Sequence, residues 1–108
     1  MDLIVVSVAQ VGDVADGEMK PIDVSGRSMI LANVAGTYRV FARECPHEWV
    51  DLTEGYLDGG TVVCAQHGYE FDVETGECVT SYVWCSALAT LPTTLRDGEV
   101  CVELKLPT

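Results

Sequence analysis

The sequence predicts an all-β domain, a small antiparallel sandwich or barrel of short strands. Short apolar or alternating runs recur along the whole chain, and pairs that end in glycine separate many of them. No stretch sustains a helical period. With 108 residues, the chain suits one compact domain, residues 1–108, with a modest core.

The alternating runs predict the strands in order along the chain. Turn pairs such as Ser25-Gly26, Ala35-Gly36 and Asp97-Gly98 separate neighbouring runs and are typical of hairpins. We expect strands over Leu3–Val8, Met19–Val24, Ser28–Asn33, Thr37–Ala42, Thr61–Cys64, Tyr69–Asp72, Ala87–Leu91 and Glu99–Leu104.

The segment from about 44 to 86 differs from its flanks, because glycine and the candidate ligands concentrate there. It predicts a small subdomain inserted between strands of a larger β base. Within it, Thr61–Cys64 and Tyr69–Asp72 would form a hairpin with residues 65–68 at its tip, and residues 45–47 would lie on a neighbouring loop. Two loops would then each present one cysteine and one histidine.

The formal charge of -11, from 17 acidic and six basic residues, limits the partners. Nucleic acid and anionic membranes would repel such a chain, whereas a protein with a basic docking face would attract it. No apolar run approaches the roughly 20 residues that span a bilayer, and residues 1–8 lack the features of a signal peptide. We therefore expect a cytoplasmic protein that is a monomer when free.

Five cysteines cannot all pair within the chain. In a reducing compartment, thiols close to histidines indicate a metal site more often than a disulfide. Cys78, Cys85 and Cys101 show no ligand-like spacing, so we expect ordinary packed or half-exposed side chains there.

The candidate ligands form two pairs, Cys45-x-His47 and Cys64-x-x-His67. Structural zinc sites commonly combine a Cys pair with a separate His pair, so this alternation fits zinc less well. A catalytic Cys-His pair would need an orienting third residue and a substrate pocket, and neither is evident. If the cysteines bind one iron and the histidines another, the site is a Rieske centre.

The segment "CPHEWVDLTEGYLDGGTVVCAQHGYEFDVETGEC" resembles the cluster-binding segment of small soluble Rieske-type ferredoxins. The resemblance extends to Leu52, Glu54-Gly55, Gly59, Phe71-Asp72 and Thr75-Gly76. It implies a Rieske-type fold and one 2Fe-2S cluster. It also implies that Cys45 and Cys64 bind one iron, that His47 and His67 bind the other, and that the chain is an electron carrier without catalytic residues of its own.

Respiratory Rieske proteins carry an additional disulfide and two hydroxyl donors near the cluster. The matching positions here hold Val50 and Gln66 in place of the cysteines, and Tyr69 and Phe71 in place of Ser and Tyr. Fewer hydrogen bonds to sulfur stabilise the reduced cluster less, so we expect a potential near the low end of roughly -150 to +300 mV.

Ferredoxins of this kind carry electrons from a flavin-containing NADH reductase to a multicomponent oxygenase. The third loop, "VTSYVWCSAL", lacks the prolines usual in dioxygenase ferredoxins. This favours a di-iron monooxygenase of aromatics or alkenes. The alternatives are the ferredoxin of a ring-hydroxylating dioxygenase and a small subunit or sensor of another redox enzyme.

Surface residues near the ligand loops suggest how a partner would dock. Trp49 and Trp84 would shield the cluster or anchor a partner, and the shielding role is the simpler interpretation. An acidic docking face would consist of Glu44, Glu48, Asp51, Glu54 and Asp58.

Overall fold

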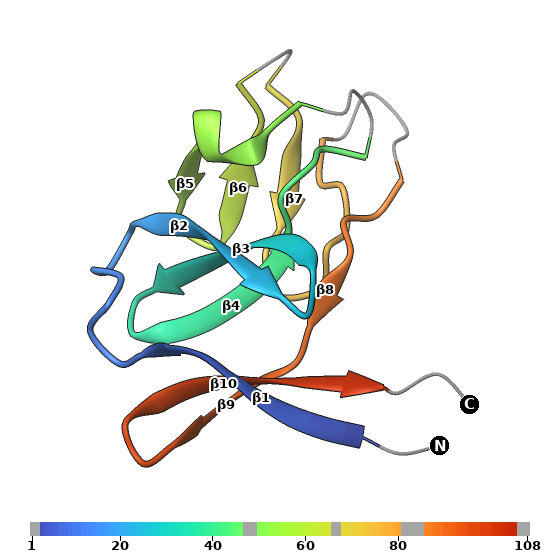
Figure 1. Ribbon diagram of the computed structural model, residues 1–108. Helices are drawn as coiled ribbons and strands as arrows, with labels where there is room; N and C mark the ends of the chain where they lie inside the picture. The colour runs from blue at the N-terminus through green and yellow to red at the C-terminus, as the bar shows by residue number, and fades with distance from the viewer. Residues whose placement is uncertain (1–2, 47–49, 66–67, 81–85, 106–108) are drawn as a thin grey trace.

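The computed structural model describes residues 3–46, 50–65, 68–80 and 86–105, and this part of the chain forms three antiparallel sheets (Figure 1). The elements are β1 (Leu3–Gln10), β2 (Met19–Val24), β3 (Arg27–Val34), β4 (Thr37–Ala42), the 3-10 helix η1 (Leu52–Glu54), β5 (Tyr56–Asp58), β6 (Thr61–Val63), β7 (Glu70–Asp72), β8 (Thr90–Leu91), β9 (Thr93–Arg96) and β10 (Glu99–Lys105). The strand orders are β1-β10-β9, β2-β3-β4-β8 and β5-β6-β7. The predicted all-β class is confirmed.

Three hairpins have the two-residue turns that the sequence predicts. Ser25-Gly26, Ala35-Gly36 and Asp97-Gly98 each place both residues at positive φ, between 50° and 89°. Positive φ at both central positions is the type I′ geometry, whose twist matches that of the flanking strands. These turns fix the register of β2 with β3, of β3 with β4 and of β9 with β10.

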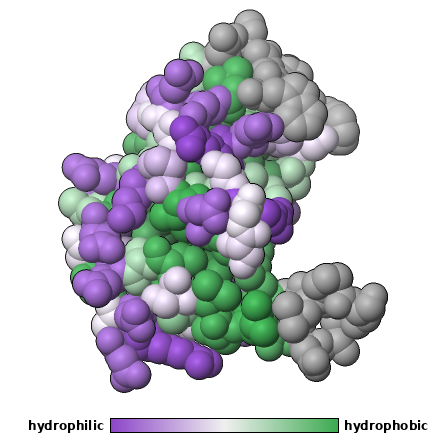
Figure 2. Space-filling model, viewed as in Figure 1, coloured by the Kyte–Doolittle hydropathy of each residue, from purple (hydrophilic) through white to green (hydrophobic). Residues whose placement is uncertain are grey.

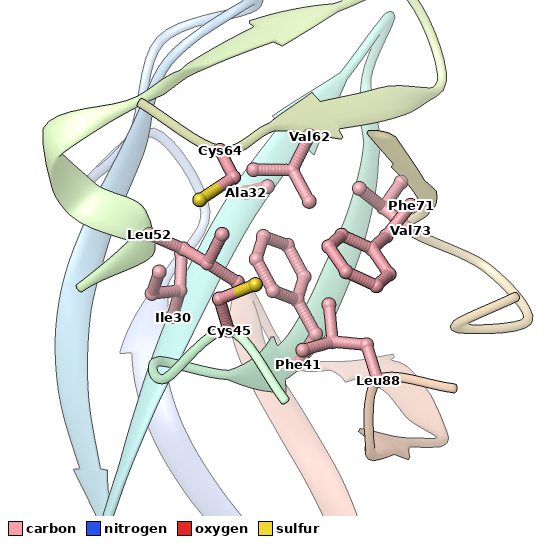
Figure 3. Close-up of a cluster of buried hydrophobic side chains, with 10 residues drawn as sticks. All are labelled: Ile30, Ala32, Phe41, Cys45, Leu52, Val62, Cys64, Phe71, Val73 and Leu88. Carbon is pink, nitrogen blue, oxygen red and sulfur yellow. The ribbon is translucent and has the colours of Figure 1, made fainter. Parts of the chain in front are cut away.

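The β2-β3-β4-β8 sheet lies between the other two sheets, and β3 is buried on both faces (Figure 1). Ile30 and Ala32 face one group of buried side chains, whereas Met29 and Leu31 face the other, because successive residues of a strand point to opposite sides. The upper cluster, drawn in Figure 3, comprises Ile30, Ala32, Phe41, Cys45, Leu52, Val62, Cys64, Phe71, Val73 and Leu88. The lower cluster comprises Val14, Val24, Met29, Leu31, Tyr38, Val40, Val100 and Val102.

The β5-β6-β7 sheet occurs in the sequence between two strands that pair with each other. Val40 and Phe41 of β4 lie opposite Leu91 and Thr90 of β8. The chain therefore leaves the middle sheet after β4, builds the upper sheet and returns beside the strand that it left. Among the described residues, no helix is long and apolar enough to cross a membrane.

Several elements differ from the expected ranges. β5, β9 and η1 were not expected, since each is too short to show a period in the sequence. The expected strand Ala87–Leu91 shrinks to Thr90–Leu91, because residue 88 bonds outside the sheet. Its N–H donates to the carbonyl of Gly76, at 2.7 Å.

Candidate metal centre

Two buried cysteines lie at the ends of two strands. Cys45 follows β4 closely and Cys64 follows β6 directly, and their exposed fractions are 0% and 1%. Both side chains belong to the upper cluster, where they approach Leu52 and Val62 from different loops (Figure 3). Neither forms a disulfide. The fold thus brings both predicted thiolate ligands to one apolar site.

The two loops that follow these cysteines are closed in the same way. The N–H of Cys45 donates to the carbonyl of Val50, and the N–H of Cys64 donates to the carbonyl of Tyr69, each at 2.8 Å. The first bond encloses residues 46–49 and the second encloses residues 65–68. His47 and His67 fall within these two loops in the sequence, but both lie outside the described residues.

The described ranges therefore contain only the cysteine half of the predicted ligand set. Within them, no group of three or more His, Cys, Asp or Glu side chains gathers as a metal site would require. The pairing of each cysteine with a histidine remains a prediction from the sequence.

An ion pair supports the first loop. Arg43 donates from Nε and Nη2 to Oδ2 of Asp51, at 2.9 and 2.8 Å. Oδ1 of Asp51 accepts from the N–H and the hydroxyl of Thr53, at 2.9 and 2.6 Å. The hydrogen bonds from Arg43 hold the pKa of the Asp51 carboxyl well below its usual range, and the Thr53 bonds lower it further. The same pair raises the pKa of Arg43.

Two glycines allow the backbone segments around the site to approach closely. A Cβ on Gly55 would lie 1.9 Å from the carbonyl oxygen of Val63, which precedes Cys64. A Cβ on Gly76 would lie 1.9 Å from the carbonyl oxygen of Leu88. Only glycine fits either position without a shift of the backbone, so each fixes a contact between two segments of the site.

The return segment lies beside the first loop. Pro46, which stands between Cys45 and His47, lines an open groove of about 880 Å³ together with Ser86, Ala87 and Leu88. The N–H of Ala42 also donates to the carbonyl of Ala89, at 2.8 Å. The return segment is therefore bonded to the end of β4 and borders the same groove as the first loop.

A model of the Rieske [2Fe-2S] domain matches residues 4–92. The chain belongs to the Rieske [2Fe-2S] domain family. It carries a Rieske 2Fe-2S cluster, so the cofactor is an iron-sulfur cluster and not zinc.

Similar proteins share both the length and the fold of this Rieske chain. The ferredoxin component of the alkene monooxygenase system of Xanthobacter autotrophicus is 32% identical over 102 residues, which cover 94% of this chain and 82% of the relative. The ferredoxin component of biphenyl 2,3-dioxygenase of Rhodococcus jostii is 32% identical over 94 residues, which cover 87% of each. In the solved complex of reduced oxygenase and oxidized ferredoxin in carbazole 1,9a-dioxygenase, one chain is 26% identical with a TM-score of 0.81. The match covers 90% of this chain and 99% of that chain. This Rieske protein is accordingly an electron-carrying ferredoxin and not itself an enzyme.

The surroundings of the two cysteines fit the Rieske cofactor. Two ferric ions, two sulfides and two thiolates sum to zero charge when both imidazoles are neutral, whereas four thiolates would give minus two. The cysteines lie among aliphatic and aromatic side chains, where a neutral group is buried at lower cost than an anion. No buried side-chain nitrogen or oxygen in the described residues lacks a hydrogen-bond partner.

The structure corrects two expectations about individual residues. Cys78 was expected to be an ordinary packed or half-exposed side chain, but it is disulfide-bonded. Asp51 was expected to belong to an acidic docking face, but its carboxylate is bound to Arg43 and Thr53. Spacing analysis does not detect either feature, since each depends on a contact that only the fold creates.

Other expectations are confirmed or fall outside the described ranges. Cys101 is buried and forms no disulfide, as expected, and Phe71 is fully buried in the upper cluster. Glu44, Glu54 and Asp58 are exposed. The predictions that lie outside the described residues concern Glu48, Trp49, Gln66, Trp84 and Cys85. Sequence reasoning missed Arg43 and Leu88, and no motif marks either.

Proposed function

We propose that Cys45 and Cys64 bind one iron of the cluster and that His47 and His67 bind the other. The observation that carries this assignment is the matched construction of the two loops. Each opens with a cysteine buried in the upper cluster and closes with a backbone hydrogen bond around a histidine position. Residues 44–86 would then be the cluster-binding subdomain, and the remaining strands would be its base.

A bound cluster would supply storage for one electron. Cys45 and Cys64 would hold one iron from the apolar side of the site, where the surrounding buried side chains exclude water. His47 and His67 would each keep one ring nitrogen directed away from the metal, so they provide the exit toward a partner.

Electron paramagnetic resonance of the reduced protein tests the ligand assignment. Mixed histidine and cysteine ligation is expected to lower the average g value below that of an all-cysteine cluster. Cys45→Ser and His47→Ala should each abolish the Rieske signal. Cys101→Ser, which removes a buried cysteine of β10, should preserve it. An all-cysteine signal, or a colourless protein that contains zinc, would refute the assignment.

We further propose that this ferredoxin receives electrons from an NADH-dependent flavin reductase and delivers them to a terminal oxygenase in the cytoplasm, as a monomer when free. The relatives named as ferredoxin components of oxygenase systems support this role. Reconstitution tests it. NADH should reduce the cluster only when a reductase is present, and direct reduction by NADH alone would contradict the scheme.

Between the two oxygenase classes, we favour the di-iron monooxygenase of alkenes or aromatics. The alkene monooxygenase component matches over 102 residues and the biphenyl dioxygenase component over 94, both at 32% identity. The third loop also lacks proline. The ferredoxin should therefore support turnover by a di-iron monooxygenase faster than turnover by a ring-hydroxylating dioxygenase. The reverse order would favour the alternative.

A further inference from the structure

Side-chain hydrogen bonds connect the two ends of the first ligand loop, in addition to its backbone hydrogen bonds. Asp51 accepts four hydrogen bonds, two from Arg43 on Oδ2 and two from Thr53 on Oδ1, all between 2.6 and 2.9 Å. Both oxygens of the carboxylate are therefore occupied. We call Arg43, Asp51 and Thr53 the clasp.

We propose that Arg43 and Asp51 are positioning residues that hold Cys45 and Val50, the two described ends of the first ligand loop, and thereby tune the cluster. The inference rests on the proposed assignment of Cys45 and His47 as ligands. It concerns how this loop is held, and it assigns neither Arg43 nor Asp51 a place on the metal.

The clasp lies where it can control the loop. Arg43 is the residue after β4, and Asp51 is the N-cap of η1, so the pair joins the two ends of the ligand segment. Two backbone hydrogen bonds already join these two ends, from Leu52 N–H to Arg43 O and from Cys45 N–H to Val50 O, at 2.8 Å each. The ion pair between Arg43 and Asp51 is a third connection between the two ends, formed by side chains. Its two hydrogen bonds fix the orientation of the Arg43 guanidinium relative to the Asp51 carboxylate.

The same carboxylate links the loop to the buried interior. By capping η1 through Thr53, Asp51 holds the short helix that inserts Leu52 into the upper cluster, where Leu52 and Cys45 are both 0% exposed. A shift of Asp51 would therefore be transmitted to the packing around Cys45. This path passes through packed side chains and requires no direct contact between the clasp and the metal.

Exposure argues that the pair positions the loop more than it stabilises the fold. The side chains of Arg43 and Asp51 are 36% and 33% exposed, and ion pairs at such exposure contribute little to the free energy of unfolding. The other two ion pairs among the described residues are longer single contacts, Lys20 to Asp13 at 3.9 Å and Arg39 to Glu74 at 3.7 Å. Of the three ion pairs in the described ranges, the pair in the clasp alone combines short hydrogen bonds with a place at the ligand loop.

The test uses the cluster-loaded protein with the variants Arg43→Gln, Asp51→Asn and the double variant. Arg39→Gln is the matched control. Arg39 lies in β4, four residues before Arg43, and its substitution also removes one positive charge from an ion pair, the one with Glu74. The measurements are the g values of the reduced cluster, its midpoint potential, and the rate of cluster loss followed by visible absorbance at fixed denaturant concentration.

Both single variants are expected to change the g values in the same way, to move the potential in the same direction, and to lose the cluster about fivefold faster. The double variant should resemble either single variant, because all three remove one connection. Arg39→Gln should match the wild type in every measurement.

Two outcomes would overturn the proposal: an effect of charge alone, and additive effects of the two substitutions. Arg43→Gln removes a positive charge and Asp51→Asn removes a negative one, so an effect of charge alone would shift the potential in opposite directions and leave the g values unchanged. Additive effects in the double variant would also contradict a shared connection. A wild-type protein without a Rieske signal would instead refute the proposed function, which separates the two failures.

Discussion

Phe71 is a fully buried ring in the same cluster of side chains as Cys45 and Cys64. A phenyl ring offers the cluster no hydroxyl donor, whereas the matching position of respiratory Rieske proteins holds a tyrosine. Hydrogen bonds to the sulfurs stabilise the reduced, more negative state and so raise the potential. The resemblance therefore predicts that the side chain at position 71 affects the electron affinity of the centre.

Phe71→Tyr is expected to raise the midpoint potential by about 40 mV, the equivalent of about 1 kcal/mol for one electron. Redox titration of the purified protein measures it. Phe41→Tyr is the matched control, because Phe41 is equally buried in the same cluster but was not matched to a hydroxyl donor. Equal shifts in both variants would show that added polarity, and not a hydrogen bond from position 71, changes the potential.

The disulfide of Cys78 gives a second residue-level prediction. Alkylation of the unfolded protein without a reductant should leave Cys78 unmodified, since it is disulfide-bonded, and prior reduction should expose it. Cys101, which forms no disulfide, should be modified under both conditions. Peptide mass spectrometry measures both sites. Modification of Cys78 without a reductant would contradict the structure.

At the scale of elements, the strands differ in how readily the sequence predicts them. β2, β3 and β4 were predicted because their alternating apolar residues face two cores and their turns contain glycine. β5 is three residues long with only Leu57 partly buried, which is too little for a period to appear. The ligand spacing was visible in the sequence, whereas the clasp joins residues eight positions apart and depends on the loop between them.

The return of the chain from the upper sheet to β8 depends on one close backbone contact. Gly76 has φ +81° and leaves no room for a Cβ beside the carbonyl of Leu88. Gly76→Ala is therefore expected to lower the free energy of unfolding by about 3 kcal/mol, through backbone strain and displacement of residue 88, and to accelerate cluster loss. Denaturant titration followed by circular dichroism and visible absorbance measures both effects.

Gly26→Ala is the matched control for that substitution. Gly26 has a similar φ of +85°, but a Cβ there would meet nothing within 4 Å. Its cost should be only about 1 kcal/mol, from the positive φ, with cluster retention unchanged. If both variants destabilise the protein equally, the contact between Gly76 and Leu88 does not hold the return segment.

At the scale of the whole molecule, the net charge bears on how a partner approaches. It is -11, and Figure 2 shows hydrophilic residues along the left side and upper part of the face in view, next to a broad hydrophobic area in its lower middle and right. Glu44 and Glu54 are exposed close to Cys45 and η1, whereas Asp58 lies at the far end of β5, opposite Thr61 and away from Cys64. A basic partner would be steered toward such a surface, and salt would screen the attraction beyond about 10 Å at 0.1 M ionic strength.

The rate of cluster reduction by the reductase is therefore expected to fall at least about tenfold between low ionic strength and 0.5 M salt, because the attraction is screened. Stopped-flow absorbance measures it. Glu44→Gln/Glu54→Gln should lower the rate at low salt and flatten its salt dependence. Asp97→Asn/Glu99→Gln removes the same charge from the β9–β10 hairpin in the base sheet and should leave most of that dependence intact. Equal effects of the two double variants would mean that net charge, and not an acidic face beside the ligand loops, guides the encounter.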